Sequence, residues 1–236
     1  MASGTSQDGP RWRRLLGAVA AGLGAGLVVV VLLLKHVPSL MAVAPAGPEA
    51  ERAAARIVTV GSALHAAIGR AGPWAAAITD TEANAWLAID LPRNHPTLLP
   101  RSLADPRVRF RPQRVEAAVR AGSGLISTVV WCDLGVTLRG VNQLGITIEG
   151  ASAGAVPIPG TPVLAEIGRR VAACGAVTEL RRLDGRMVLV VYIPAMLGGG
   201  GPQWRLESLR IGDGEAAVAG STTLPEPAPA NAAAQD

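Results

Sequence analysis

The chain has 236 residues, of which 49% are hydrophobic and only 17% charged, and its formal net charge is +4. Residues 1–36 hold four basic residues and one acid, so they carry +3 and the other 200 residues carry only +1. A charge confined to the N-terminus argues against a nucleic-acid partner, because binding would need basic residues gathered over the folded part of the chain.

Residues 15–34 form an uninterrupted apolar segment, LLGAVAAGLGAGLVVVVLLL. At about 1.5 Å of rise per residue, an α-helix of this length reaches roughly 30 Å, the thickness of a bilayer's hydrocarbon core. Three arginines precede it, whereas Lys35 is the only basic residue that follows it before Arg52. The positive-inside rule then predicts a cytoplasmic tail over residues 1–14 and an extracytoplasmic chain beyond Lys35, which makes a single-pass protein of the cell membrane.

A cleaved signal peptide is the alternative interpretation of this segment. Signal peptides have an apolar region of about 7 to 15 residues, which is shorter than residues 15–34. Two Ala-x-Ala patterns end at Ala44 and Ala46, and the first is followed directly by Pro45, which we expect to hinder cleavage. The length of the segment favours a retained anchor.

Ala18, Gly22 and Gly26 recur at four-residue spacing within the segment, so they share one helix face. Small residues at this spacing let two membrane helices approach closely, as in a helix dimer. Glycine is also frequent in membrane helices generally, so both interpretations stay open.

The rest of the chain divides by composition. Residues 35–48 contain three prolines among small residues and are predicted to form a short stalk. Residues 49–221 are numerous enough for one domain with its own core. Residues 222–236 are rich in proline and alanine and are predicted to be a disordered tail.

Three segments of the domain have the signals of helices. Apolar residues recur at three- and four-residue intervals over 49–68, which predicts the first helix. Thr79 and Glu82 have the spacing of a capping box, so a second helix should begin there and end at Pro92. A third helix is predicted over 161–174, where a threonine and a proline suit the N-terminus.

The remaining segments alternate between apolar and polar residues, as strands with one covered face do. Short turns separate them, which favours antiparallel hairpins. The run 187–193 is apolar at both its odd-numbered and its even-numbered positions, so both faces of this strand must be covered. Together these signals predict an α+β fold, with a curved antiparallel β-sheet packed on two or three helices. The predicted strands are a hairpin over 107–120, then 125–138, 141–149, 177–183, 187–193, 204–211 and 215–221.

Arginines occupy alternate positions of the first predicted hairpin, on its wet face. Arg107, Arg109, Arg111 and Arg114 are therefore candidates for contact with anionic lipid headgroups or acidic envelope polymers. The alternative is a solvated strand face whose charges prevent aggregation through the sheet edge.

The two cysteines, Cys132 and Cys174, lie in the part predicted to be extracytoplasmic, where a disulfide would persist. The first falls on the apolar face of a strand and the second on that of a helix, so a disulfide would pin the third helix to the sheet. Two separate core thiols are equally compatible with the sequence, because the distance between them cannot be read from it.

No arrangement of residues typical of catalysis is found. The histidines, His36, His65 and His95, belong to no metal-ligand spacing. The glycine run 198–201 lacks the Lys-Ser/Thr that follows in a phosphate-binding loop, and no Gly-x-Ser-x-Gly occurs. The sequence predicts neither an enzyme nor a metal or cofactor site.

The order of these signals, from an anchor through a helix, a T-x-x-E-x-N-x-W-L segment and a P-x-P crossover, resembles the YpmS-like family of bacterial membrane-anchored proteins. More loosely, the pattern over residues 50–220 is similar to tubular lipid-binding proteins, which wrap a curved sheet around a long helix. The residues that carry the resemblance are Thr79, Glu82, Asn84, Trp86, Leu87, Pro157 and Pro159.

Two functional classes follow as expectations. The first is a membrane-anchored extracytoplasmic binding module for a lipid or another amphiphile, which the resemblance implies by analogy of fold. The second is a scaffold or assembly factor of the cell envelope that binds another envelope protein through its sheet edge or basic face.

Overall fold

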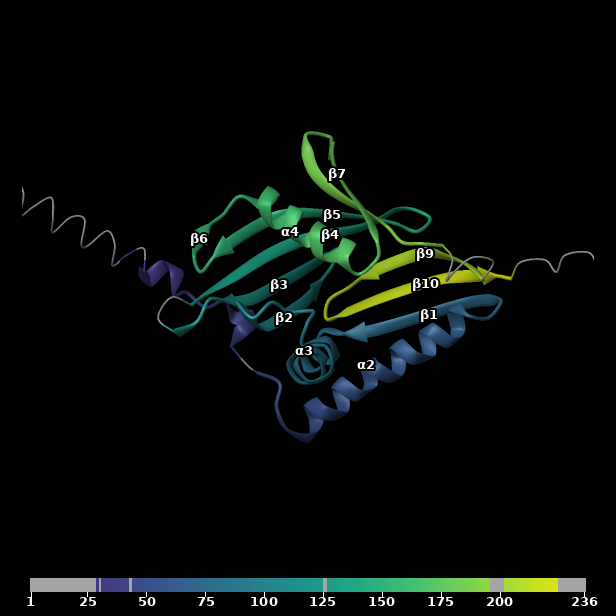
Figure 1. The fold of residues 1–236 in the computed structure, drawn as a ribbon, viewed down its shortest axis with the longest axis horizontal. Helices are drawn as coiled ribbons and strands as arrows, with labels where there is room; N and C mark the ends of the chain where they lie inside the picture. The colour runs from purple at the N-terminus through teal and green to yellow at the C-terminus, as the bar shows by residue number, and fades with distance from the viewer. Residues whose placement is uncertain (1–28, 30, 43, 125–126, 196–201, 225–236) are drawn as a thin grey trace, which may run out of the picture.

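The structure is a computed structural model that describes residues 29, 31–42, 44–124, 127–195 and 202–224. These residues form an α+β fold with antiparallel sheets (Figure 1), which confirms the predicted class. The described strands belong to two sheets, whereas the sequence predicted one.

The larger sheet has the strand order β2-β3-β4-β5-β8-β7, and the two-residue β6 pairs with β5. Its hairpins turn at Gln113, Asn142 and Asp184, whose φ angles of 51° to 62° are those that tight turns between antiparallel strands require. The strands are β2 (Leu103–Arg111), β3 (Arg114–Ala121), β4 (Thr128–Gly140), β5 (Gln143–Ala153), β6 (Val156–Pro157), β7 (Val177–Leu183) and β8 (Arg186–Tyr192).

The smaller sheet has the order β1-β10-β9 and consists of β1 (Gly72–Thr79), β9 (Gln203–Ile211) and β10 (Glu215–Thr223). β1 was not predicted, because Gly72 and Pro73 looked like helix breakers only. Proline is tolerated there because β1 is an edge strand, which pairs with β10 alone among the described strands. β10 also runs past the predicted domain end at residue 221, and Thr222 is buried.

The three helices of the domain are α2 (Gly47–Ile68), α3 (Asp80–Asn94) and α4 (Gly160–Ala173). The capping box of α3 is confirmed: Glu82 N–H donates to Thr79 Oγ1 at 3.2 Å, and Thr79 N–H donates to Glu82 Oε2 at 2.9 Å. The predicted end at Pro92 was wrong by two residues. The proline falls in the last turn, which the bond from His95 N–H to the Leu91 carbonyl closes at 2.9 Å.

Three apolar clusters hold these layers together. The first joins α2 to α3 through Ala50, Ala54 and Ala85, whose small side chains let the helices approach closely. The second joins α3 to both sheets around Phe110 and Ile211. The third lies under α4 and is centred on Leu164, Leu189 and Val191.

β8 is covered on both faces, as its sequence predicted. Val188, Leu189, Val190 and Val191 are each at most 4% exposed, although they alternate between the two faces of the sheet. β8 is the best-buried strand of the larger sheet. Burying each side chain of this size contributes about 1.5 to 3 kcal/mol to stability.

Within the described part of the chain, no helix is both long and apolar enough to cross a membrane. Of the predicted span 15–34, residues 15–28 and 30 lie outside the described residues. Ala18, Gly22 and Gly26, the predicted helix-dimer face, are among them.

Candidate functional site

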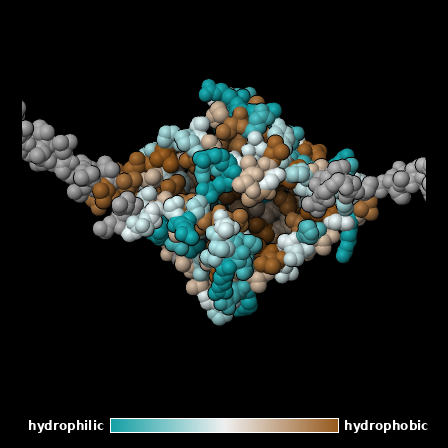
Figure 2. Space-filling model, in the orientation of Figure 1, coloured by the Kyte–Doolittle hydropathy of each residue, from teal (hydrophilic) through white to brown (hydrophobic). Residues whose placement is uncertain are grey.

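An open groove of about 830 Å³ lies between β4 and β9. Among its lining residues, Val136, Leu138, Leu209 and Ile211 are apolar and buried or half-buried. Charged residues such as Asp213 are exposed. Figure 2 shows the corresponding hollow, which has a largely hydrophobic floor. We call this the central groove, and its volume falls within the usual range of small-ligand sites.

The groove exists because α4 covers only part of the sheet's apolar face. Strand pairing places Val136 opposite Ile146, and Ile146 opposite Leu189, so these three side chains share one face. Leu164 of α4 packs on Leu189 and is 1% exposed, which closes the face over β8. Toward β4 the same face is only half-buried.

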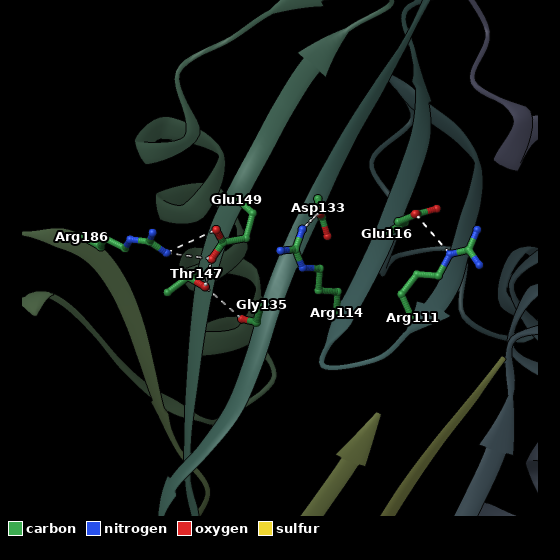
Figure 3. Close-up of polar contacts among 8 residues, drawn as sticks. All are labelled: Arg111, Arg114, Glu116, Asp133, Gly135, Thr147, Glu149 and Arg186. Atoms are coloured by element: carbon green, nitrogen blue, oxygen red, sulfur yellow. Dashed lines mark hydrogen bonds and ion pairs between the residues drawn. The ribbon is translucent and has the colours of Figure 1, made fainter. Parts of the chain in front are cut away.

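The opposite face of the larger sheet carries a row of ion pairs, shown in Figure 3. Arg114 Nη1 lies 2.8 Å from Asp133 Oδ2, and Arg186 Nη1 lies 3.3 Å from Glu149 Oε1. Thr147 Oγ1 bonds the same Glu149 oxygen at 3.2 Å. The row crosses the sheet from β2 to β8, and each arginine in it faces an acid.

Three of the four arginines proposed as contacts for anionic surfaces belong to this row. Arg109 Nη1 lies 3.3 Å from Glu116 Oε2, and Arg111 contacts both Glu116 and Asp213, at 3.5 and 3.1 Å. The hydrogen bond to Asp213 and the charge of Glu116 raise the pKa of Arg111. The face is therefore close to neutral, so its charge gives less reason to expect contact with an anionic surface.

Arg107 does not lie on the wet face as predicted, because it is only 5% exposed. α3 and the segment before α2 pack against this end of β2 and bury the side chain. Its Nη1 donates to the Pro106 carbonyl at 3.0 Å, and its buried Nε has no hydrogen-bond partner among the described residues. Alternation along β2 indicated the parity of Arg107 but not the elements that cover it.

The two cysteines are free thiols in the structure, so the proposed disulfide is not formed. Cys132 is buried on β4, whereas Cys174 is exposed at the C-terminal end of α4. α4 packs on β5, β7 and β8, which carries its C-terminal end away from β4. Burial, with a smaller contribution from the charge of Asp133, raises the pKa of Cys132 to about 11, so its thiol stays protonated.

The domain directly holds the end of the predicted membrane segment. Ala155 N–H donates to the Leu33 carbonyl at 2.8 Å, and Thr128 Oγ1 donates to the Leu34 carbonyl at 2.6 Å. Carbonyls of the last helical turn have no partner further along the helix. The Leu33 carbonyl also accepts from His36 N–H at 3.2 Å. A Cβ on Gly154 would overlap the Leu33 carbonyl oxygen, so glycine is needed at this position.

This contact corrects the predicted role of the stalk. Residues 35–48 do not separate the domain from residue 34, because Thr128 of β4 and Ala155 in the turn after β5 already contact Leu34 and Leu33. Lys35 adds a bond from its Nζ to the Ser127 carbonyl at 3.2 Å. The short helix η1 (Ser39–Met41) then packs beside β2.

The described residues include no group of three or more His, Cys, Asp or Glu side chains that could hold a metal ion. The groove residues were not identified from the sequence, although their apolar parity was visible. Their proximity depends on how two sheets meet, which no local pattern encodes.

Comparison of the chain with protein-family models, with curated proteins and with solved structures finds no match. The resemblance to the YpmS-like family therefore stays a prediction.

Proposed function

We propose that the chain is a single-pass, membrane-anchored binding module on the outer side of the cell membrane. In this proposal the central groove holds the apolar part of a lipid or another amphiphile. The observation that carries it is the half-covered apolar face between β4 and β9, with its polar rim. A groove with an apolar floor and charged edges suits a ligand that is itself apolar at one end and polar at the other.

The junction at Leu33 and Leu34 supports a membrane-proximal role. Thr128, which contacts Leu34, begins β4, and Val136 of the groove lies eight residues further along the same strand. At about 3.3 Å per residue, the two positions are roughly 26 Å apart. If residues 15–34 span the bilayer, the groove holds its ligand away from the anchor and at a fixed distance from it.

Native mass spectrometry of the full chain, extracted from membranes in mild detergent, tests this function. We expect lipid to remain bound to the wild type and to be lost from Val136→Glu and Leu209→Glu, which place a charge in the groove. Val177→Glu is the matched control, since Val177 is 64% exposed on β7 and does not line the groove. A wild type that consistently carries no lipid would contradict the proposal.

A second candidate is a scaffold that binds another envelope protein through β7. Among the described strands β7 pairs only with β8, and it exposes Val177 and Leu180. An edge of this kind can accept a strand from another protein. A photoreactive amino acid in place of Leu180 should crosslink to a second protein in intact cells, and crosslinks within the chain alone would rule this candidate out.

A further inference from the structure

Arg107 presents a charge for which the described part of the chain offers no counter-ion. Its side chain is 95% buried, forms no ion pair with a described acid, and leaves Nε without an acceptor. Within the described part of the chain, its side chain forms one hydrogen bond, to the Pro106 carbonyl. A buried charge of this kind is strongly destabilising unless an anion or a hydrogen-bonding partner faces it.

Arg107 lines two cavities that share the segment Ala44–Pro45. One cavity, of about 480 Å³, lies between the C-terminal half of α3 and the start of β2. The other, of about 370 Å³, lies between α2 and the N-terminal half of α3. Arg107 thus lines both cavities.

The walls of the larger cavity are mostly apolar. They include Leu87 and Leu91 of α3, Leu99 in the following loop and Leu103 of β2. The cavity therefore combines a buried cation with aliphatic surface. This combination is complementary to a molecule that has an anionic head and an apolar tail.

The other charged groups around the two cavities do not change the preference for a molecule with an anionic head. Arg101 lines the larger cavity, is exposed, and adds positive charge near its opening. His95 also lines the cavity, and its Nε2 lies 3.7 Å from Asp90 Oδ2. Asp105 also lines it, but its carboxylate pairs with Arg120 at 3.3 Å. Glu49 lines the smaller cavity and forms no ion pair with Arg107.

We infer that Arg107 is the anchor of a second binding site, which takes the carboxylate or phosphate head of a single-chain amphiphile. The planar guanidinium can donate two parallel hydrogen bonds to such a head. The apolar tail lies against Leu87, Leu91, Leu99 and Leu103. This site is separate from the central groove, with which it shares no lining residue.

Thermal unfolding of the full chain in phosphatidylcholine nanodiscs tests the inference with four probes, with Val136→Glu present throughout so that the central groove binds none of them. Dodecanoate and dodecyl phosphate supply the head on a tail, dodecanol supplies the tail alone, and inorganic phosphate supplies the head alone. A ligand at 100 times its Kd should raise Tm by about 5 °C or more. We expect this rise with dodecanoate or dodecyl phosphate, and little change with the other two probes.

Arg107→Met should abolish the rise and leave the unliganded protein at least as stable as the wild type, because it removes an unpaired buried charge. Arg109→Met, on the same strand but with Glu116 as its partner, is the matched control and should keep the rise. If Arg107→Met does not fold, Leu99→Trp fills the cavity from its half-buried wall and should weaken the effect.

Three results would overturn the inference. An equal rise with dodecanol would show that the charge is irrelevant, and an equal rise with inorganic phosphate would show a site for free anions. A rise retained in Arg107→Met would place the ligand elsewhere. Because Val136→Glu disables the central groove throughout this series, the two proposals fail independently.

Discussion

Asn84 on α3 and Val108 on β2 exchange two hydrogen bonds. Asn84 Nδ2 donates to the Val108 carbonyl at 2.7 Å, and Val108 N–H donates to Asn84 Oδ1 at 2.8 Å. The amide side chain thereby pairs with the outer edge of β2 as a neighbouring strand would. It protects that edge and fixes α3 against the larger sheet.

Replacing Asn84 by leucine should lower the free energy of unfolding by about 2 kcal/mol or more, because two partly buried backbone groups lose their partners. Urea unfolding of the full chain in detergent measures this change. Asn94→Ala is the control, since Asn94 is exposed on the same helix and bonds only Asp90. Equal losses in both variants would mean that the strand-like pairing contributes nothing specific.

Gly154→Ala should detach Leu33 and Leu34 from the domain. The added methyl group would overlap the Leu33 carbonyl oxygen, so the bonds from Ala155 and Thr128 should break. Hydrogen exchange at the Ala155 amide should then rise at least tenfold, since a lost bond of about 1.4 kcal/mol corresponds to that factor.

Gly124→Ala controls for backbone strain in this experiment. Gly124 has φ +58°, nearly the same as the +59° of Gly154, but an added Cβ there meets no atom within 4 Å. Its substitution should leave exchange at Ala155 unchanged. Faster exchange in the Gly124 variant as well would trace the effect to strain and not to the junction.

The two cysteines should react at very different rates. Cys174 is exposed, whereas Cys132 is buried and its raised pKa keeps the thiol protonated at neutral pH. A membrane-impermeant maleimide added to intact cells at pH 7.5 should therefore label Cys174 alone, and Cys174→Ala should remain unlabelled. Labelling only after the cells are opened would contradict the proposed orientation in the membrane.

Stability should fall as the pH rises from about 9 to about 11. In this window the folded protein keeps the Cys132 proton, because burial raises the pKa of that thiol to about 11, while the unfolded chain loses it. The folded state then binds more protons, so raising the pH favours unfolding, by about 2 to 3 kcal/mol over the full window. Below pH 9 both states are protonated and this contribution is constant.

Comparison with Cys132→Ala isolates the contribution of this thiol from other groups that titrate at high pH. The difference in free energy of unfolding between the wild type and the variant, measured with urea, should change by that amount between pH 8 and 11. As the pH rises, the wild type should lose stability relative to the variant. A difference that does not depend on pH would show that Cys132 is not the group responsible.

Local patterns were sufficient for most of the elements. Thr79 and Glu82 set the start of α3 through bonds that span only three residues, and the apolar run of β8 could be stable only with both faces covered. Pro73 was interpreted only as a helix breaker, and β1 was missed, because the cost of proline in a strand depends on whether the strand is central or at an edge. That distinction follows from strand order and not from the residue itself.

The sequence by itself determined the α+β class, the antiparallel hairpins and the parity of the strands it predicted, because these depend on interactions between residues close along the chain. Tertiary structure decided which residues on a given face of a strand are covered by other elements. Arg107 and Arg109 lie on the same strand two residues apart, yet only Arg107 lies beneath α3 and the segment before α2. The central groove and the contact at Leu33 and Leu34 likewise depend on how distant segments meet, and distances through space are set only when the whole chain packs.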